Sequence, residues 1–324
     1  GIGRQHYGID ENIYDLVVID EAARATSSEL AIAMRLGEKV ILVGDHKQLP
    51  PLFDEAHIKA AKRELPKLDE EELKRSDFER AFVSDYGKTV GRSLLTQYRM
   101  APPIGKLVSE NFYDGALQTG RSLTDENYQN LIISFATPVT WFDTSSEGNQ
   151  NREATPKGKG VNEKSFINPL EADCIISIIR RMYDTDSDGE IFKEGEEPKI
   201  GVICMYGEQV RHLIRKINSM PWARSLLERR IVKVDTVDSY QGKENDIIIL
   251  SLVRSNARGT QGYVSSENRA NVSLSRAKEC LFIVGNSQMW SQHNQSSAFG
   301  RVFKFIEDNN SPDYSIRPVK GISQ

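Results

Sequence analysis

Residues 16–45 read LVVIDEAARATSSELAIAMRLGEKVILVGD. The stretch opens with an apolar run, Leu16 to Ile19, that ends in two acids, and a second run, Lys39 to Val43, ends in a glycine and an aspartate. Short apolar runs that end in polar residues are typical of buried parallel strands. The residues between them, Ser27 to Arg35, have a helical pattern. A strand, a helix and a strand in this order predict a βαβ unit and therefore an α/β fold.

The second half of the chain shows the same α/β pattern. Asn168 can cap a helix, Pro169 suits its first position, and Glu171 stands three residues after the cap. This spacing predicts a helix with a capping box that runs to about Tyr183. Further apolar runs predict strands over residues 199–205, 232–236, 246–252 and 280–284, and a helix over 208–217.

Three other segments are assigned from their composition. Residues 93–96, with the sequence SLLT, are predicted to start another strand. Residues 54–76 are dominated by lysine, glutamate and aspartate and predict a solvated helical insertion. Residues 144–164 are rich in glycine, asparagine, serine and lysine, which predicts a mobile loop.

The bulk composition sets limits on the class of protein. The chain has 324 residues, which suggests about two domains, and its net charge of −4 excludes a globally basic surface. A local groove can still bind nucleic acid. Cys174, Cys204 and Cys280 lie far apart, without metal-ligand spacing, and predict buried thiols in a reducing compartment, cytoplasmic or nuclear. Apolar runs such as Ile247 to Leu252 are too short to span a bilayer.

Asp20 and Glu21 follow the first predicted strand and resemble a Walker B motif. A carboxylate at a strand end can hold Mg²⁺ through its waters, and a neighbouring carboxylate can deprotonate an attacking water. A strand that simply ends in acids is an equally good interpretation of this dipeptide alone. The second predicted strand leads into Gly44-Asp45-His46-Lys47-Gln48-Leu49-Pro50-Pro51, a polar turn closed by two prolines. The amide of Gln48 could contact a γ-phosphate or a water there.

Two arginines lie in further motifs. Arg99 belongs to QYRM, residues 97–100, and Arg276 belongs to NVSLSRAK, residues 271–278. A guanidinium can bridge two oxygens of a transferring phosphoryl group, which lysine imitates poorly. An arginine that only pairs with a carboxylate is the alternative. Between them, VDTVDSYQGKEND, residues 234–246, carries hydroxyl side chains and Gly242, whose bare backbone allows a ligand to approach closely.

Together these five motifs, in this order, resemble motifs II to VI of superfamily 1 helicases, and most closely the up-frameshift-like group (superfamily 1B). The resemblance covers most of the chain, including Asn111-Phe112-Tyr113 and Asn286. It implies RecA-like modules of the P-loop NTPase type. Residues 1–92 would be the C-terminal part of a first module, and residues 93–324 a complete second module. It also implies ATP-driven 5′-to-3′ movement on single-stranded DNA or RNA.

The resemblance implies a role for each motif residue. Asp20 would bind Mg²⁺, Glu21 would be the catalytic base, and Gln48 would contact the γ-phosphate. Arg99 and Arg276 would be arginine fingers that face the acids across a cleft sized for ATP. The remaining candidates are Tyr98, expected to stack on adenine, Gly242 and Glu244, expected to line the nucleotide's far side, and Thr236, Ser239 and Gln241, expected to contact the strand or couple it to the nucleotide.

A helicase of this type also needs a Walker A loop, G-x-x-x-x-G-K-[ST], which holds the β- and γ-phosphates. Gly87-Lys88-Thr89 resembles its end, but position 82, where the first glycine should stand, is Phe82. Only 19 residues precede Asp20, so the first module is expected to be truncated and to need the missing N-terminal half of the same polypeptide. These 324 residues alone are therefore expected neither to hydrolyse ATP nor to unwind.

Two further patterns each allow two interpretations. Residues 184–191 begin like an EF-hand calcium loop, but the twelfth position is Gly195 rather than glutamate, which favours a solvated acidic loop. Basic residues cluster on the 208–217 helix and after it and could either track phosphates or form an ordinary charged face: Arg211, Arg215, Lys216, Arg224, Arg229, Arg230 and Lys233.

Two other classes of function stay open at this point. One is a non-catalytic half-helicase that serves as a scaffold for protein or nucleic acid, and a Walker A upstream in the gene would argue against it. The other is a nuclease or modification enzyme in which this part is only the motor. Retention of both acids and both arginines favours the ATPase.

Overall fold

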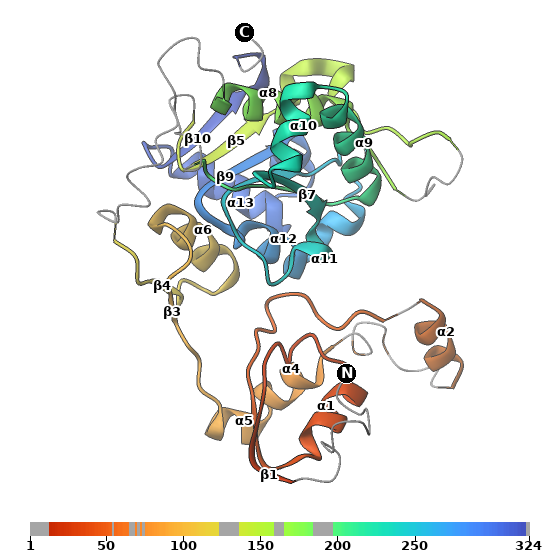
Figure 1. The fold of residues 1–324 in the computed structure, drawn as a ribbon, viewed down its shortest axis with the longest axis vertical. Helices are drawn as coiled ribbons and strands as arrows, with labels where there is room; N and C mark the ends of the chain where they lie inside the picture. The colour runs from red at the N-terminus through yellow and green to blue at the C-terminus, as the bar shows by residue number, and fades with distance from the viewer. Residues whose placement is uncertain are drawn as a thin grey trace. The chain divides into compact units, whose positions relative to one another are not determined.

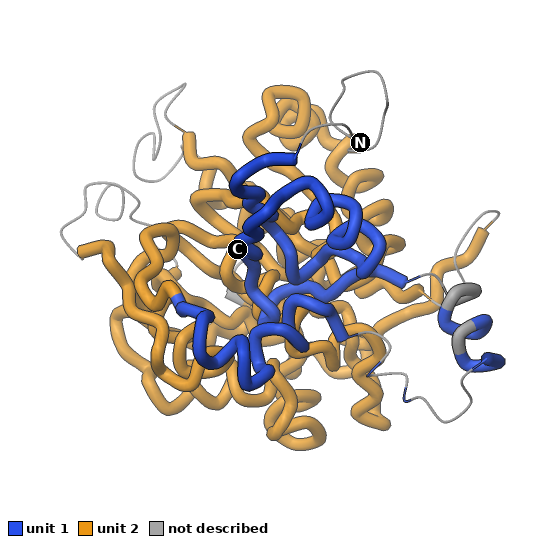
Figure 2. The backbone as a smooth tube through the Cα atoms, turned by 90° about the horizontal axis from the view of Figure 1, so that it is seen from below, with its two compact units in different colours: residues 1–93 blue, residues 94–324 orange. Residues whose placement is uncertain are grey.

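A computed structural model describes residues 13–53, 55–64, 69, 72, 75–122, 136–158, 165–183 and 197–321. The chain divides into two compact units, residues 1–93 (unit 1) and residues 94–324 (unit 2), which Figure 2 shows in different colours. Each unit has its own sheet and its own packed residues, so each is described by itself.

Unit 1 contains the predicted βαβ unit. Strand β1 (Tyr14–Ile19) lies parallel to β2 (Gly37–Leu42), and helix α1 (Ser27–Met34) connects them. A complete capping box starts α1, because the Thr26 hydroxyl accepts from the backbone N–H of Glu29 and the Glu29 carboxylate accepts from that of Thr26. Local sequence signals therefore determine where this helix begins.

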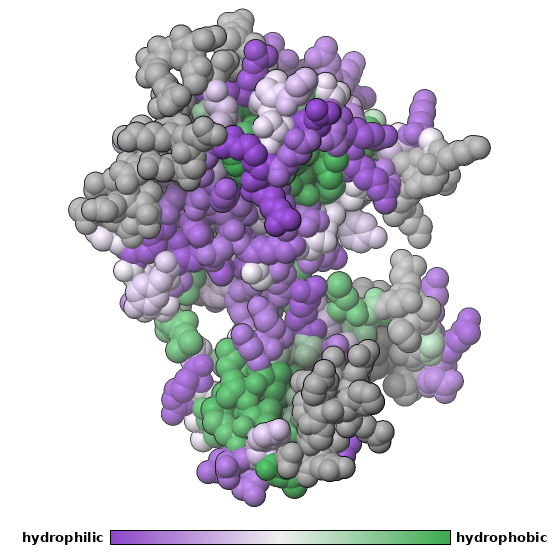
Figure 3. Space-filling model, in the orientation of Figure 1, coloured by the Kyte–Doolittle hydropathy of each residue, from purple (hydrophilic) through white to green (hydrophobic). Residues whose placement is uncertain are grey.

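A small core holds unit 1 together, and much of its sheet is exposed. Buried Ala22, Ala23, Leu30 and Phe78 form the core. Helices α2 (Glu55–Glu64), α4 (Asp77–Val83) and α5 (Asp85–Val90) complete the described part, and Gly87-Lys88-Thr89 lies within α5 rather than in a phosphate-binding loop. Figure 3 shows a hydrophobic patch on the surface of this unit. Four apolar side chains of the strands and their ends are exposed: Leu16, Val18, Ile41 and Val43.

Unit 2 is built on a six-stranded parallel sheet (Figure 1). The strand order is β10-β5-β9-β8-β6-β7, and every neighbouring pair is parallel. The strands are β5 (Val139–Asp143), β6 (Ile200–Cys204), β7 (Val232–Thr236), β8 (Asn245–Ser251), β9 (Ala277–Gly285) and β10 (Tyr314–Pro318). The four strands and the helix predicted over residues 199–284 are confirmed within a few residues.

Helices cover both faces of this sheet. One core joins α8 (Pro169–Tyr183), α9 (Gly207–Asn218) and α10 (Pro221–Glu228) to alternate residues of β8, Ile247 and Ile249. Helices α6 (Pro102–Phe112), α12 (Glu267–Leu274) and α13 (Ala298–Asp308) pack on one another and against β5, β8 and β9. Strands covered on both faces read as continuous apolar runs, and this arrangement is the α/β architecture expected of a RecA-like module.

The structure corrects two predictions. Residues 93–96 do not form a strand of their own, because β3 comprises only Thr96–Gln97, paired with β4 (Gln118–Thr119), and Leu94 is 90% exposed. Residues 145–151 form 3₁₀ turns on either side of a kink at Gly148, and Ala154 pairs with Ile167, so much of the predicted loop 144–164 has a defined structure. The six-stranded sheet also contains two strands outside the predicted set, β5 and, at the edge beside it, β10.

The helix predicted from Asn168 is confirmed as α8, but its capping box is only half formed. The Asn168 side chain accepts from the backbone N–H of Glu171, whereas the N–H of Asn168 donates to Gln209. The carboxyl group of Glu171 instead accepts from Ser251 and Val253, outside the helix. A residue that local spacing assigns to a helix cap is thus used in tertiary structure.

The three cysteines are free and buried, as predicted. Burial raises the pKa of each thiol well above its ordinary value, so they stay protonated. None of the helices in the described part is both long and apolar enough to cross a bilayer. The calcium-loop pattern at residues 184–195 lies outside the described residues.

Candidate nucleotide site

The two acids of the Walker B-like motif lie in a tight turn at the end of β1. Glu21 has a φ of +54°, which is uncommon for a residue with a side chain, and its N–H donates to Oδ1 of Asp20 at 2.8 Å. The N–H of Ala22 donates to the carbonyl of Val43 beyond the end of β2. This turn leaves Asp20 and Glu21 exposed at the carboxyl edge of the β1–β2 pair.

The turn after β2 lies at the same edge. Asp45 accepts from Nε2 of Gln48 at 2.9 Å and from the N–H of Lys47 at 2.9 Å. A Cβ at Gly44 would lie 2.8 Å from the backbone nitrogen of Ala23, so glycine allows this turn to pack against the Asp20-Glu21 turn. Unit 1 therefore brings its three predicted catalytic residues, Asp20, Glu21 and Gln48, to one end of its strands.

In unit 2, the side chain of Gln97 shapes the QYRM turn. Its Oε1 accepts from the backbone N–H groups of Arg99 (2.9 Å) and Met100 (2.7 Å). Its Nε2 donates to the carbonyl of Met100 and to Oγ1 of Thr119, both at 2.9 Å. Nη1 of Arg121 donates to the carbonyl of Arg99 at 2.8 Å. The backbone that carries Arg99 is thus fixed from both sides.

The guanidinium of Arg99 reaches motifs V and VI. Its Nε lies 2.5 Å from Oε2 of Glu244, and its Nη1 donates to the carbonyl of Ser275 at 3.3 Å. Nζ of Lys278 lies 3.2 Å from the other Glu244 oxygen. Partial burial alone would raise the pKa of Glu244, but hydrogen bonds and charges from Arg99 and Lys278 outweigh it and lower the pKa. Glu244 is therefore an ionised acceptor between two cations.

Arg276 lies beside this group. It is buried, its Nε donates to the carbonyl of Val272 at 3.1 Å, and its Nη2 donates to Oγ of Ser275 at 3.2 Å. Both predicted arginine fingers of unit 2 thus contact Ser275, Arg99 through the carbonyl and Arg276 through the hydroxyl. Motif IV therefore meets motifs V and VI here, although Arg99 and Glu244 are 145 residues apart in the sequence.

Two residues predicted to contact the nucleotide directly are accessible. Tyr98 is 73% exposed, and its ring packs against Gly120, where a Cβ would come within 2.2 Å of the ring. Gly242 has a φ of +73°, which favours glycine, and a Cβ built there would meet no atom within 4 Å. An open aromatic face and an open backbone are what stacking and close approach require.

The three residues predicted to contact the strand lie in or directly beside helix α11 (Val237–Tyr240). Oγ1 of Thr236 donates to Oγ of Ser239 at 3.2 Å, and Gln241 follows the last turn of the helix. Nζ of Lys243 donates to the carbonyl of Ser239. These contacts stabilise the turn itself. The strand role of the three residues stays a prediction.

Two residues of the Arg99 group were missed from the sequence. Lys278 lies two residues after Arg276 in the same motif, so its position was a usable signal. Arg121 gave no signal, because it stands in no recognisable pattern and acts through tertiary contacts, a buried ion pair with Glu279 at 3.0 Å among them. Tyr113 of the Asn111-Phe112-Tyr113 stretch accepts from Nδ2 of Asn271 in motif VI at 2.9 Å.

Five of the seven residues of the basic cluster pair with acids, Lys233 with Asp235 among them. Arg211 pairs with Glu208, Lys216 with Asp173, Arg224 with Glu228, and Arg229 with Glu197. Such pairs are typical of an ordinary charged face, and this favours the simpler of the two interpretations of these residues.

A magnesium ion would have to be held largely by phosphate and water. Nowhere in the described ranges do three or more histidine, cysteine, aspartate or glutamate side chains gather as a metal-binding group. One carboxylate with phosphate oxygens and waters is a common ligand set for Mg²⁺. Exposed Asp20 fits this set, and its role as a ligand stays a prediction.

Comparison with known proteins assigns the chain to a family. A family model described as "AAA domain" matches residues 73–288, and a second model of the same description matches residues 5–55. The chain is 35% identical over 274 residues to "ATP-dependent helicase NAM7" of Saccharomyces cerevisiae, covering 83% of this chain and 25% of that protein. It is 33% identical over 280 residues to "Regulator of nonsense transcripts 1 homolog" of Neurospora crassa, covering 86% and 23%.

A third relative is named for DNA. The "DNA polymerase alpha-associated DNA helicase A" of Saccharomyces cerevisiae is 29% identical over 293 residues, covering 86% of this chain and 39% of that protein. The chain therefore spans between 23 and 39% of the length of these three relatives. Because one family model alone matches more than half of the chain, the chain belongs to the AAA domain family, and its similarity to these relatives supports its place among the up-frameshift-like superfamily 1 helicases.

Proposed function

We propose that the full-length protein is an ATP-dependent helicase that moves 5′ to 3′ on single-stranded DNA or RNA. The observation that carries the proposal is the meeting of Arg99 and Arg276 at Ser275, next to ionised Glu244. Guanidinium groups can stabilise the charge that develops on a transferring phosphoryl group, and two motifs supply one each here.

The residues of unit 1 would supply the rest of the chemistry. Glu21 accepts the proton of the attacking water, and Gln48, held at the strand end by Asp45, orients that water or the γ-phosphate. Mg²⁺ held by Asp20 would neutralise phosphate charge when bound. That these three face Arg99 and Arg276 across one cleft is part of the proposal.

Glu244 positions two cations of the site. Its carboxylate holds Arg99 and Lys278. Phosphate oxygens offer the guanidinium of Arg99 an equivalent bidentate partner, so nucleotide binding would draw Arg99 from the carboxylate. Tyr98, the exposed residue just before Arg99, would stack on the base.

The catalytic assignment is tested by turnover of the full-length protein. Glu21→Gln removes the base without changing its size, and we expect kcat for ATP to fall by about 10²- to 10⁴-fold. Glu38→Gln, at an exposed acid of β2, is the matched control and should leave kcat unchanged. Near-normal turnover in Glu21→Gln would refute the assignment.

The 324 residues on their own are proposed to be inactive, because no phosphate-binding loop occurs in their sequence. A Mg-ATPase assay of this chain should show no turnover above buffer. Turnover that Glu21→Gln abolishes would overturn this statement. Adding single-stranded DNA or RNA to the full-length protein then identifies the strand that stimulates it, and duplexes with a 5′ or a 3′ tail test the direction of movement.

A further inference from the structure

The backbone just after β8 is strained. Val253 has a φ of +68°, and the N–H of Arg254 donates to the carbonyl of Leu252 at 2.7 Å, which closes a three-residue turn around Val253. Turns of this kind are rare, and a β-branched residue at positive φ is a clear outlier. Strained backbone of this kind persists only where surrounding structure holds it, and it occurs preferentially at ligand sites.

A buried carboxyl group holds this turn. Glu171 of α8 is fully buried, and its Oε2 accepts from the N–H of Val253 at 2.8 Å and from Oγ of Ser251 at 2.6 Å. Asn168, at the start of the same helix, donates to the carbonyl of Val253 at 3.2 Å. Both polar backbone groups of Val253 are therefore satisfied by α8 and its cap. A side chain without an acceptor at position 171 would leave the Val253 N–H without that bond.

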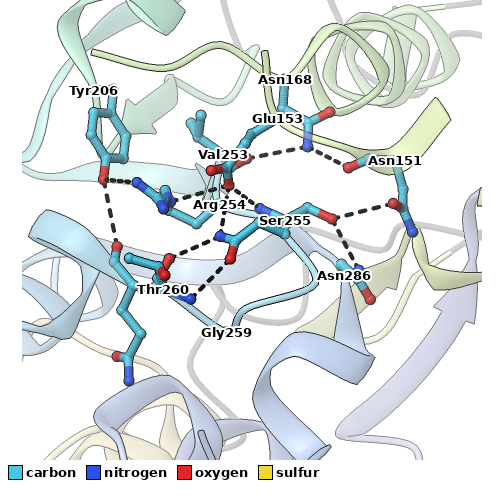
Figure 4. A network of polar contacts seen from close by, with 12 residues as sticks. Asn151, Glu153, Asn168, Tyr206, Val253, Arg254, Ser255, Gly259, Thr260 and Asn286 are labelled. Carbon is cyan, nitrogen blue, oxygen red and sulfur yellow. Dashed lines mark hydrogen bonds and ion pairs between the residues drawn. The ribbon is translucent and has the colours of Figure 1, made fainter. Parts of the chain in front are cut away.

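The turn sets the direction of the residues that follow it. Figure 4 shows the polar contacts that these residues make. Arg254 pairs with Glu153 at 3.1 Å and lies over the ring of Phe166. The N–H of Ser255 donates to the same Glu153 carboxylate at 2.7 Å, and its hydroxyl accepts from Nδ2 of Asn286 at 3.0 Å. The loop after β8 is thereby tied to the segment that follows the 3₁₀ residues 145–151 and to the end of β9.

This loop forms one wall of a polar pocket at the carboxyl edge of the unit 2 sheet. The pocket has room for about 370 Å³ of contents, and Ser255 and Asn256 line it together with Arg152, Asn286 and His293. Amides, hydroxyls, one arginine and one histidine predominate, and none of its described lining residues is acidic. Neutral hydrogen-bonding groups with a cationic residue suit an anionic ligand with sugar and base edges.

We propose that this pocket binds one nucleotide unit of the single strand and that Glu171 is a positioning residue that sets its wall through the Val253 turn. This proposal rests on the proposed helicase function. It gives a strand-binding role to residues that were not among the strand contacts predicted from the five motifs. The strain at Val253 is then the cost of directing Ser255 and Asn256 into the pocket. Glu171 acts through backbone and does not touch the strand.

The test uses the full-length protein and measures how its ATPase depends on oligonucleotide concentration. Glu171→Leu keeps the volume but removes the acceptor, and the oligonucleotide concentration for half-maximal stimulation should rise about tenfold, with kcat at saturation unchanged within about twofold. Glu171→Gln keeps one acceptor oxygen and should stay close to wild type.

A second substitution separates positioning from general stability. Glycine adopts positive φ without strain, so Val253→Gly in the Glu171→Leu background should restore strand affinity, which it could not do if Glu171 only filled space. Asn256→Ala removes a pocket side chain that is itself held by Glu153 and the backbone of Thr260, and it should weaken strand affinity whether or not Glu171→Leu folds. Normal strand affinity in Asn256→Ala, or failure of Val253→Gly to rescue a folded Glu171→Leu protein, would overturn the proposal.

These outcomes differ from a failure of the proposed function. If wild-type protein shows no strand-stimulated ATPase, the helicase assignment fails. If wild type is stimulated and Glu21→Gln is inactive, but Asn256→Ala binds strand as tightly as wild type, only the pocket assignment fails.

Discussion

At the scale of single residues, Glu244 decides where the guanidinium of Arg99 lies. Both side chains are more than a third exposed, so their ion pair adds less than about 1 kcal/mol to stability. Its value lies in orientation instead. We predict that Glu244→Gln lowers kcat of the full-length ATPase about tenfold, since a misplaced catalytic group is costly, while the unfolding free energy changes little.

A matched control exists in the same unit. Glu267 of α12 pairs with Arg301 of α13 at 2.6 Å, and these two side chains are about as exposed as Glu244 and Arg99. Glu267→Gln should therefore change neither kcat nor stability measurably. Equal kcat values for the two variants would contradict the role given to Glu244.

Glu171 predicts how stability depends on pH. Burial raises its pKa from 4.5 to about 8, against the opposing effect of hydrogen bonds from Ser251 and Val253, and the nearby Glu153 adds to the rise. Between pH 4.5 and 8 the folded chain therefore holds a proton that the unfolded chain has released. Stability from this group is complete below pH 4.5 and is lost as pH rises towards 8, by at most about 1.4 kcal/mol per pH unit.

The measurement is urea unfolding of the 324-residue chain at pH 6 and pH 8. Wild type should lose more stability between the two than Glu171→Gln, whose amide has no proton to release over this range. Parallel losses in both proteins would show that Glu171 does not titrate in this window.

At the scale of elements, local signals predicted structure well and tertiary roles poorly. The strand–helix–strand at residues 14–42 and helix α8 follow from apolar period and caps, which act within a few residues. The apolar pair Leu94-Leu95 led to a wrong strand prediction, because a short apolar run does not show whether a neighbouring strand is available to pair with it. Glu171 was correctly placed near a helix start, but its partners lie 80 residues further on, at Ser251 and beyond. No local pattern encodes that distance.

The candidate site shows the same division. Its motif residues are recognisable because their chemistry requires particular side chains in a fixed order. The contacts that orient them, such as Arg121 at the Arg99 carbonyl, depend only on geometry and leave no pattern in the sequence.

The QYRM turn supports a prediction about one element. Gln97 makes four hydrogen bonds, three to the backbone of the turn and one to Oγ1 of Thr119 in β4. We predict that Gln97→Ala destabilises unit 2 by about 2 kcal/mol, because several half-buried backbone groups lose partners, and that kcat falls as Arg99 loses its support. Gln118→Ala, at an exposed position of β4, is the control for urea unfolding and ATPase assays. An unchanged unfolding midpoint for Gln97→Ala would exclude this role.

At the scale of the whole molecule, the two units differ in how well their sheets are covered. Unit 2 has six parallel strands, and β8 and β9 are buried over nearly their whole length. Unit 1 has a two-stranded described sheet with Leu16, Val18 and Ile41 exposed. Two strands bury too little apolar surface to be stable alone, whereas six strands covered on both faces form a cooperative core.

This difference predicts unequal stability within one chain. Amides of β8 and β9 should exchange with deuterium only through global unfolding of unit 2, while amides of β1 and β2 should exchange through local opening at much lower free energy. Hydrogen exchange of the 324-residue chain, followed by mass spectrometry of peptides from both sheets, measures both at once. The free energies of opening should differ by several kcal/mol, and mild denaturant should accelerate exchange in β8 and leave β1 almost unaffected, because only global opening exposes a large surface. Equal protection and equal denaturant dependence in β1 and β8 would mean that the two units unfold as one cooperative body, and that the exposed strands of unit 1 draw their stability from contacts beyond their own small core.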